Sequence, residues 1–249
     1  MRWHFWREQL EQKANRPLPA VSAPGGFTPK QARLVLRSLR KFQLGESGEG
    51  RIAHEIDEVR WPGVDADLRA LIKLWVREEG RHARILGQMV KAQGGTLLRK
   101  DWSARGFEMA RRLLGVRFKL LVALAAEVAG TAFYGLLSRA LRPCELKAAL
   151  AELESDEELH LAFQSEIFGM FATTAAKYFL IQIAWIVLGL GVSALVFWDH
   201  AATLGAVGIP RLQTLCELMR RVFEVRSRIR AHSSRGLRNP SRRRSVLAK

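Results

Sequence analysis

The chain has 249 residues, 48% of them hydrophobic, and a formal net charge of +16 at pH 7. This length and apolar content are ample for a packed core in one large or two small domains. The only two cysteines, Cys144 and Cys216, have neither metal-type spacing nor the pattern of a disulfide framework, which argues against a disulfide-stabilised secreted protein.

Apolar residues recur mostly at three- and four-residue spacing, which predicts an all-α fold. The N-terminus lacks the apolar stretch and cleavage site of a signal peptide, so we expect a cytoplasmic protein. Residues 3–13 are predicted as a short amphipathic helix, and a Pro-, Gly- and Ser-rich loop completes an N-terminal segment, 1–27. Thr28, followed by Pro29 and Gln31, is typical of a helix start, and this first long helix is expected to reach about Val59.

Three more long helices are predicted after the first one. They cover residues 65–93, residues 116–141 and a segment that begins near residue 145. Helices of roughly 25 residues, each about 37 Å long, suit an antiparallel four-helix bundle. We assign this bundle to residues 28–175, with additional apolar helices on its C-terminal side.

A long apolar stretch follows the bundle. Residues 178–198 carry no formal charge and lie in a segment, 176–209, that we expect to form an apolar helix or hairpin. The stretch is long enough for a membrane span of about 20 residues, whereas Gly189 and Gly191 could instead turn a hairpin. Peripheral or integral association with the inner membrane is one hypothesis, and burial in the core or in a homodimer interface is the other.

The last segment, 210–249, is strongly basic. From Arg211 onward it contains twelve Lys and Arg against two Glu, which gives it +10 of the total charge. A helix is predicted over 210–232, and the remaining 17 residues are predicted to be disordered. Basic tails attract phosphate on lipid or nucleic acid. Because this tail lacks aromatic residues between its basic ones for base stacking, a membrane surface is a better candidate partner than nucleic acid.

The strongest functional signal is a repeated Glu-x-x-His. Glu79 and His82 lie on the second predicted bundle helix, and Glu157 and His160 lie on the fourth. Residues at i and i+3 share one helix face, and apolar residues flank both pairs on that face, so the four groups should point inward. Buried carboxylates and imidazoles need partners because an uncompensated buried charge is costly. Two facing pairs of this composition suit Fe, Mn or Zn.

The other two bundle helices should each add one carboxylate. On the third helix, Glu127 is the only acidic residue between Glu108 and Glu145, and its neighbours are apolar. On the first helix, Glu46 and Glu49 both follow the spacing of the core stripe. The spacing alone therefore leaves either of them as the ligand.

These motifs resemble those of the ferritin-like di-iron carboxylate superfamily. Gly45-Glu46-Ser-Gly-Glu-Gly-Arg51-Ile52 is similar to the first-helix motif of the demethoxyubiquinone hydroxylases, in which the Glu after the Gly is a ligand. Glu78-Glu79-Gly-Arg-His82 and Asp156-Glu157-Glu-Leu-His160 resemble the second and fourth motifs of that group. The former also resembles a motif of soluble acyl-carrier-protein desaturases. The ligand set that the resemblance implies is Glu46, Glu79, His82, Glu127, Glu157 and His160.

The resemblance covers roughly residues 35–170 and implies two bound iron ions, with manganese as an alternative. The leading hypothesis is an O₂-dependent oxidoreductase (a hydroxylase or monooxygenase, a desaturase or an oxidase) that acts on a lipophilic substrate with a separate electron donor. Ferroxidase or iron-handling activity without an organic substrate is the second hypothesis, and modification of tRNA is a third. A bundle whose acidic and His residues merely pair with arginines is the alternative without a metal.

Overall fold

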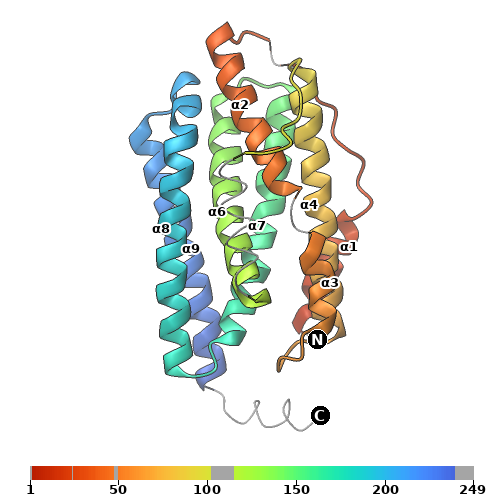
Figure 1. Cartoon of the computed structure of the whole chain (residues 1–249), viewed down its shortest axis with the longest axis vertical. Helices are drawn as coiled ribbons and strands as arrows, with labels where there is room; N and C mark the ends of the chain where they lie inside the picture. Colours follow the sequence, from red (N-terminus) through yellow and green to blue (C-terminus); the bar gives the residue numbers. More distant parts are fainter. Residues whose placement is uncertain (1, 24, 48–49, 102–114, 239–249) are drawn as a thin grey trace.

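The computed structural model describes residues 2–23, 25–47, 50–101 and 115–238 (Figure 1). The regular elements among these residues are α-helices and none is a strand, so the predicted all-α fold is confirmed. In chain order the helices are α1 (Arg2–Lys13), α2 (Pro29–Glu46), α3 (Gly50–Glu58), α4 (Ala66–Ala92), α6 (Val116–Ala140), α7 (Glu145–Phe171), α8 (Ala175–Ala206) and α9 (Arg211–Arg238).

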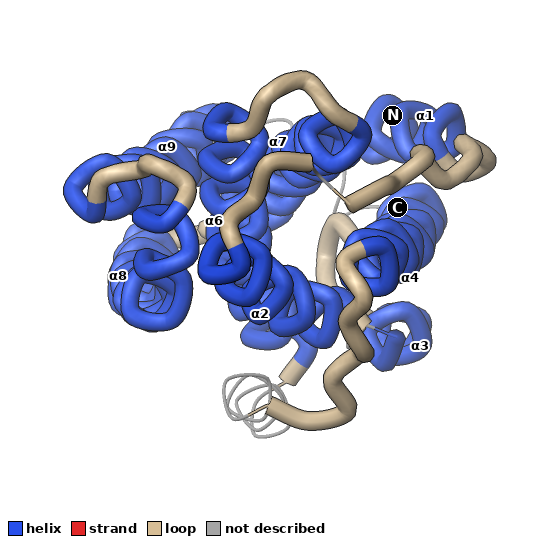
Figure 2. Tube along the Cα trace, turned by 90° about the horizontal axis from the view of Figure 1, so that it is seen from above, coloured by secondary structure: helices blue, strands red, loops and turns tan. Residues whose placement is uncertain are grey.

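Four long helical segments surround a common centre. The successive helices α2 and α3, together with α4, α6 and α7, form the predicted bundle. In Figure 1, α4 and α6 run in the same direction along the bundle, whereas α2 and α7 run in the opposite direction. Seen along the bundle in Figure 2, α1 packs outside α4, and α8 and α9 form a further layer against α6 and α7.

The ends of α2 and α4 follow from local sequence. Thr28 Oγ1 accepts a hydrogen bond from the backbone N–H of Gln31 at 3.3 Å, which confirms the predicted capping box. Asp65 caps α4 in the same way, with Oδ1 accepting from the N–H of Leu68 at 2.9 Å. After α4, Gly94 has a φ of +71°, a conformation that favours glycine and stops the helix.

The first long helix is interrupted. A continuous helix to Val59 is wrong, because α2 ends at Glu46 and the separate helix α3 begins at Gly50. Gly45, Gly48 and Gly50 fall at this point of the sequence. Each glycine costs about 1 kcal/mol in a helix interior relative to alanine, so three of them within six positions weaken the helix where it breaks.

α8 is one continuous helix, so a hairpin at Gly189 and Gly191 is wrong. Gly189 instead lies against α9, where a Cβ added to it would be 3.0 Å from Cγ1 of Val222. Nearby, Trp185 Nε1 donates to the backbone oxygen of Val222 at 2.9 Å. The glycine at this position therefore permits close packing of two helices rather than a turn.

The C-terminal helix is longer than predicted. α9 extends to Arg238, so the disorder predicted from residue 233 onward is wrong for residues 233–238. The rest of the predicted disordered tail, 239–249, lies outside the described residues.

Among the described residues, two helices, α6 and α8, are long and apolar enough to cross a membrane. They differ in their surroundings: in the most apolar 18-residue segment of each helix, 94% of α6 but only 28% of α8 is buried inside the protein. α6 is therefore a core helix of the bundle, whereas α8 exposes an apolar face. Core helices of soluble proteins pass the same test of length and composition.

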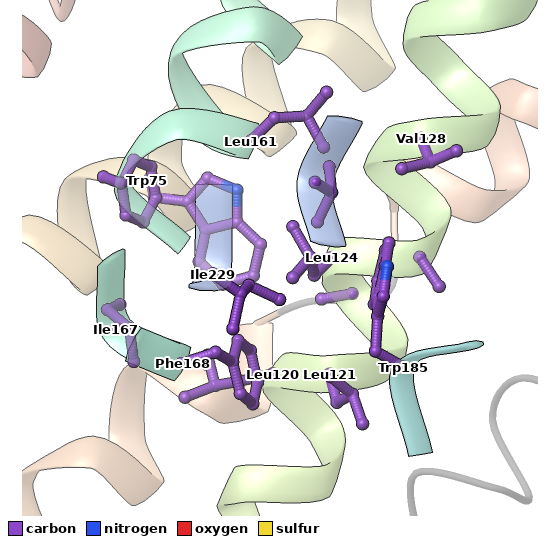
Figure 3. Packing of buried hydrophobic residues seen from close by; sticks show 14 of the residues in the cluster. Trp75, Leu120, Leu121, Leu124, Val128, Leu161, Ile167, Phe168, Trp185 and Ile229 are labelled. Carbon is purple, nitrogen blue, oxygen red and sulfur yellow. The ribbon is translucent and has the colours of Figure 1, made fainter. Parts of the chain in front are cut away.

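Two apolar clusters fill the bundle and leave a polar layer between them. On α4, the buried residues of the first cluster end at Trp75 and those of the second begin at Ile85. On α7, the two clusters are separated by the segment between Leu153 and Leu161. Figure 3 shows part of the first cluster, which includes Trp75 of α4 and Trp185 of α8. Both Glu-x-x-His motifs lie in the polar layer, with apolar side chains on either side.

Candidate metal centre

Two facing helices bring the two Glu-x-x-His motifs together. α4 supplies Glu79 and His82, and α7 supplies Glu157 and His160; one ligand atom from each of the four lies within 4.8 Å of the others. All four side chains are buried, as the apolar stripe around each motif predicted. This cluster of carboxylates and imidazoles is compatible with a di-iron site.

Each carboxylate of the cluster lies near both imidazoles. Nδ1 of His82 is 3.7 Å from Oε1 of Glu79 and 3.2 Å from Oε1 of Glu157. Nδ1 of His160 is 3.1 Å from Oε1 of Glu79 and 3.3 Å from Oε2 of Glu157. The two glutamates therefore occupy the space between the two rings, and both rings direct the same nitrogen inward.

Glu127 joins this cluster from α6. Its Oε2 lies 3.4 Å from Nδ1 of His160. Its other oxygen, Oε1, accepts hydrogen bonds from Trp75 Nε1 and from Gln164 Nε2, both at 2.9 Å. The predicted third-helix carboxylate thus lies beside the cluster, and two N–H donors fix its orientation.

Glu46 approaches from the end of α2. Its Oε1 accepts a hydrogen bond from the hydroxyl of Tyr134 at 2.6 Å. The charge of Glu46 acts to raise the pKa of both Glu79 and Glu157, which places it within electrostatic reach of the cluster. Glu49, the alternative on the first helix, lies outside the described residues.

A second layer of carboxylates contacts the far side of each imidazole. Nε2 of His160 lies 2.9 Å from Oε2 of Glu78, and Nε2 of His82 lies 3.4 Å from Oδ2 of Asp156. A carboxylate at Nε2 favours the tautomer with its proton on that nitrogen, which leaves the lone pair of Nδ1 directed into the cluster. This is the state in which an imidazole binds a metal ion.

The outer carboxylates are already compensated by basic side chains. Glu78, His82 and Asp156 also lie close enough together to hold an ion. However, Lys13 Nζ lies 2.7 Å from Asp156 Oδ1, and an Arg16 nitrogen lies 2.6 Å from its Oδ2. The same guanidinium is 3.2 Å from Glu78. These cations occupy the place that a metal would take, so we interpret the outer group as support for the imidazoles.

The inner carboxylates have no such compensation. Among the described residues, Glu79, Glu127 and Glu157 form ion pairs only with His82 and His160 and with no Lys or Arg. Within the part of the chain that the structure describes, three buried atoms of the cluster make close contacts but no hydrogen bond, namely Glu79 Oε1, His82 Nδ1 and Glu157 Oε1. Leaving buried polar atoms unpaired is costly, and divalent cations at the centre would pair all three.

Without a metal, Glu79, Glu157 and His160 favour their protonated forms, whereas nearby His160 lowers the pKa of Glu127 to about 2 although burial acts to raise it. Burial, followed by the charges of neighbouring carboxylates such as Glu127, raises the pKa of Glu79 and of Glu157 well above the usual range. Burial acts to lower the pKa of His160, but the charge of Glu127 and the hydrogen bonds to Glu127, Glu157 and Glu78 together outweigh it, and the pKa is raised well above its ordinary value. A bound dication would replace these protons. Burial also acts to raise the pKa of Asp156, but hydrogen bonds from His82 and Lys13 lower it, so that carboxylate stays ionised.

Several supporting residues were not identified from the sequence. Glu78 and Asp156 could have been found from one signal, an acidic residue directly before the Glu of each Glu-x-x-His motif. Lys13 and Arg16 leave no such signal, because their partners are distant in the sequence; Arg16 is 62 positions from Glu78 and 140 from Asp156.

No known protein family, curated protein or solved structure matches the chain. The function is therefore inferred from the chemistry of the site.

Proposed function

We propose that the cluster binds two iron ions and that the protein uses them to activate O₂, as an oxidoreductase of the hydroxylase, desaturase or oxidase type. The proposal is carried by one observation, a buried ring of carboxylates and imidazoles without a Lys or Arg partner among the described residues. Iron suits this mixture of oxygen and nitrogen ligands, and the ferritin-like di-iron resemblance supports the same choice. The proposed ligands are Glu46, Glu79, His82, Glu127, Glu157 and His160.

The proposed roles follow from the distances. Glu79 and Glu157 would contribute to holding both ions, because each carboxylate lies near both imidazoles. His82 and His160 are assigned one to each ion. Glu127 and Glu46 would complete the ligand set from α6 and α2. When bound, the ferrous pair would supply electrons to O₂, which is chemistry of the metal rather than of the side chains.

The protein contributes orientation and exclusion of water. Trp75 and Gln164 hold Glu127 through two N–H donors, and Tyr134 holds Glu46 through its hydroxyl. The apolar clusters on either side of the polar layer limit access of solvent to the ligands. Preoriented ligands in a dry layer favour metal binding and protect a reactive centre from side reactions.

The outer face of α8 supports a lipophilic substrate that is taken from a membrane surface. Apolar side chains follow one another along this face and are 61–84% exposed: Phe179, Leu180, Ile183, Val187 and Trp198. A contiguous exposed apolar face of this kind marks an interaction site. Lys177, Arg226 and Arg230 are exposed at the end of the face where α8 begins, and would attract anionic lipid head groups.

We propose that α8 lies along the membrane surface rather than across the membrane. Its inner face packs on the protein, where Asp199 forms ion pairs with Arg37 at 2.7 Å and Lys41 at 2.5 Å. A helix in the membrane plane can keep such pairs within the protein while its apolar face meets lipid. A span would carry the exposed arginines of the adjoining α9 into the hydrocarbon, which is costly.

Vesicle flotation tests this part of the proposal. The protein should float with vesicles that contain anionic lipid and less with neutral ones, and the triple variant Phe179→Ser/Ile183→Ser/Val187→Ser should lose binding. Leu97→Ser, which changes an exposed leucine outside α8, is the control. A protein that stays unbound under all conditions would rule out the membrane surface. Conversion of a dimer to a monomer by the triple variant would instead indicate a dimer interface.

Anaerobic loading with Fe(II) tests the metal centre. We expect two iron ions per chain and a spectroscopic signature of magnetic coupling between them after oxidation. O₂ uptake should continue beyond the iron equivalents when an electron donor and a lipophilic substrate are supplied. Uptake that stops once the iron is oxidised would favour ferroxidase activity, and a chain that retains no iron would refute the proposal.

A further inference from the structure

The N-terminal segment reaches the metal centre from outside the bundle. α1 lies along α4, and its last turn and the following residues bring two basic side chains to the outer carboxylates. These side chains are Lys13 and Arg16, which come from a part of the chain that supplies none of the proposed ligands.

Asp156 is the point at which these contacts converge. Its side chain is fully buried, and Lys13, Arg16 and Arg81 lie 2.7, 2.6 and 3.8 Å from its oxygens. One oxygen of the same carboxylate faces Nε2 of His82 at 3.4 Å. The position of this imidazole therefore depends on a carboxylate that is held largely by cations of the N-terminal segment.

Arg16 connects the two halves of the outer layer. One of its nitrogens lies 2.6 Å from Asp156 on α7 and 3.2 Å from Glu78 on α4. Its other terminal nitrogen lies 3.6 Å from Glu152. Asp156 contacts the imidazole of His82, and Glu78 contacts that of His160. The guanidinium of Arg16 therefore pairs with both of the carboxylates that orient the two imidazoles.

The attachment of α1 is specific. Trp6 Nε1 donates to Glu166 on α7 at 2.9 Å, and Arg7 forms an ion pair with Asp67 on α4 at 2.6 Å. Behind the basic pair, a guanidinium nitrogen of Arg81 donates to the backbone oxygen of Pro17 at 2.8 Å. Contacts on both sides of Lys13 and Arg16 thus fix the segment against the two helices that carry the Glu-x-x-His motifs.

We propose that Lys13 and Arg16 are positioning residues of the metal centre and that the N-terminal segment sets its affinity for metal. This inference rests on the proposed function, because it assumes that the inner cluster binds iron. Without the two cations, Asp156 is a buried carboxylate that lacks its main partners. It then turns toward other donors or admits water, and the imidazole that it orients loses its fixed direction. Loss of such a support typically weakens metal binding by about 10–100-fold.

The test compares two ways of disturbing α1 in the full-length chain. Lys13→Ala/Arg16→Ala removes the contacts to the outer carboxylates, whereas Arg7→Ala weakens the attachment of α1 and leaves those contacts in place. Anaerobic titration with Fe(II) against a chelator gives the Kd, and the visible absorption of bound Co(II) reports the ligand geometry. We expect the double variant to weaken Fe(II) binding by at least about 10-fold and to alter the Co(II) spectrum. We expect Arg7→Ala to lower Tm and to change neither readout.

The outcomes separate this inference from the proposed function. If the unaltered chain binds no Fe(II), the proposed function itself fails. If it binds Fe(II) and the double variant binds equally tightly, only the positioning role is refuted. Equal weakening by Arg7→Ala would also refute it, since docking of α1 alone would then explain the effect. If the double variant does not fold, Arg16→Gln provides the same comparison, because it keeps Lys13 on Asp156 and removes the bridge to Glu78.

Discussion

Nε2 of His160 lies 2.9 Å from Oε2 of Glu78, so the acidic residue that precedes one Glu-x-x-His motif holds the histidine of the other. The relationship is reciprocal, because Asp156 precedes the second motif and lies 3.4 Å from Nε2 of His82 in the first. The two motifs therefore act as one unit, in which each helix orients the imidazole of the opposite helix. A change on α4 is expected to affect a ligand on α7.

Glu78→Ala is predicted to weaken Fe(II) binding by about 10–100-fold, although Glu78 is not a proposed ligand. The change leaves Nε2 of His160 without its acceptor, and the ring is then free to rotate. Anaerobic titration against a chelator measures the Kd. Glu58→Ala, which removes an exposed carboxylate at the end of α3, is the control and should leave the Kd unaltered. An unaltered Kd in Glu78→Ala would contradict the orienting role.

Glu157→Ala should remove half or more of the bound iron, because this carboxylate lies near both imidazoles and would contribute to holding both ions. The matched control is Glu158→Ala, since the neighbouring carboxylate points away from the centre and forms an ion pair with Arg228 at 3.1 Å. Metal analysis after removal of excess iron gives the ratio of iron to protein. Undiminished iron in Glu157→Ala, with the fold intact by circular dichroism, would count against the ligand assignment.

Iron affinity is predicted to rise with pH. Burial and neighbouring carboxylates raise the pKa of Glu79 and Glu157, so the metal-free folded protein keeps protons that the unfolded chain loses at lower pH. Fe(II) has to displace these protons. The metal-free protein should lose stability as pH rises through the raised pKa values, so the increase in Tm on adding Fe(II) should grow with pH.

Calorimetric titration in buffers of different ionisation enthalpy measures the protons released on binding. Net proton release on binding of Fe(II) is the expected result. Binding without proton release, or an affinity that falls as pH rises, would show that the inner groups are not the ones displaced.

Features encoded by neighbouring residues could be predicted from the sequence. The capping box at Thr28 and the bounds of α4 depend on side chains within one helical turn of the helix end. The convergence of Glu79, His82, Glu157 and His160 followed from three-residue spacing on apolar helix faces. The helix caps depend on local hydrogen bonds, and the convergence of the motifs follows from burial of the apolar helix face on which each motif lies.

Features decided by tertiary contacts could not be predicted. Gly189 is compatible with a turn in the sequence, and only the side chain of Val222 on α9 explains its presence within a continuous helix. The break after Glu46 depends on whether tertiary packing offsets the unfavourable helix propensity of three nearby glycines, and the sequence does not give the packing energy. The contact of Arg16 with Asp156 joins segments that no local pattern relates.

Tyr134→Phe should lower the free energy of unfolding by about 1–3 kcal/mol. The tyrosine is fully buried, and burial, together with the charge of Glu46, raises its pKa well above the usual value, so it remains a donor at neutral pH. The change removes its 2.6 Å hydrogen bond to Glu46. Denaturant unfolding measures the loss. The only other tyrosine, Tyr178, lies partly exposed at the start of α8, so Tyr178→Phe should have a smaller effect. Equal effects would argue that the bond to Glu46 contributes nothing specific.

Gly189→Leu is predicted to destabilise the protein, whereas Gly191→Leu is not. Even a Cβ at position 189 would lie 3.0 Å from Val222, so a larger side chain must push α9 away from α8, at a cost of about 1–3 kcal/mol. Position 191 has open space around it, and replacing glycine within a helix gains up to about 1 kcal/mol. Denaturant unfolding of the two variants gives the comparison. If Gly191→Leu were the more destabilising change, α8 would have to pack on α9 through a different face, and the exposed apolar face proposed for the membrane would have to be reassigned with it.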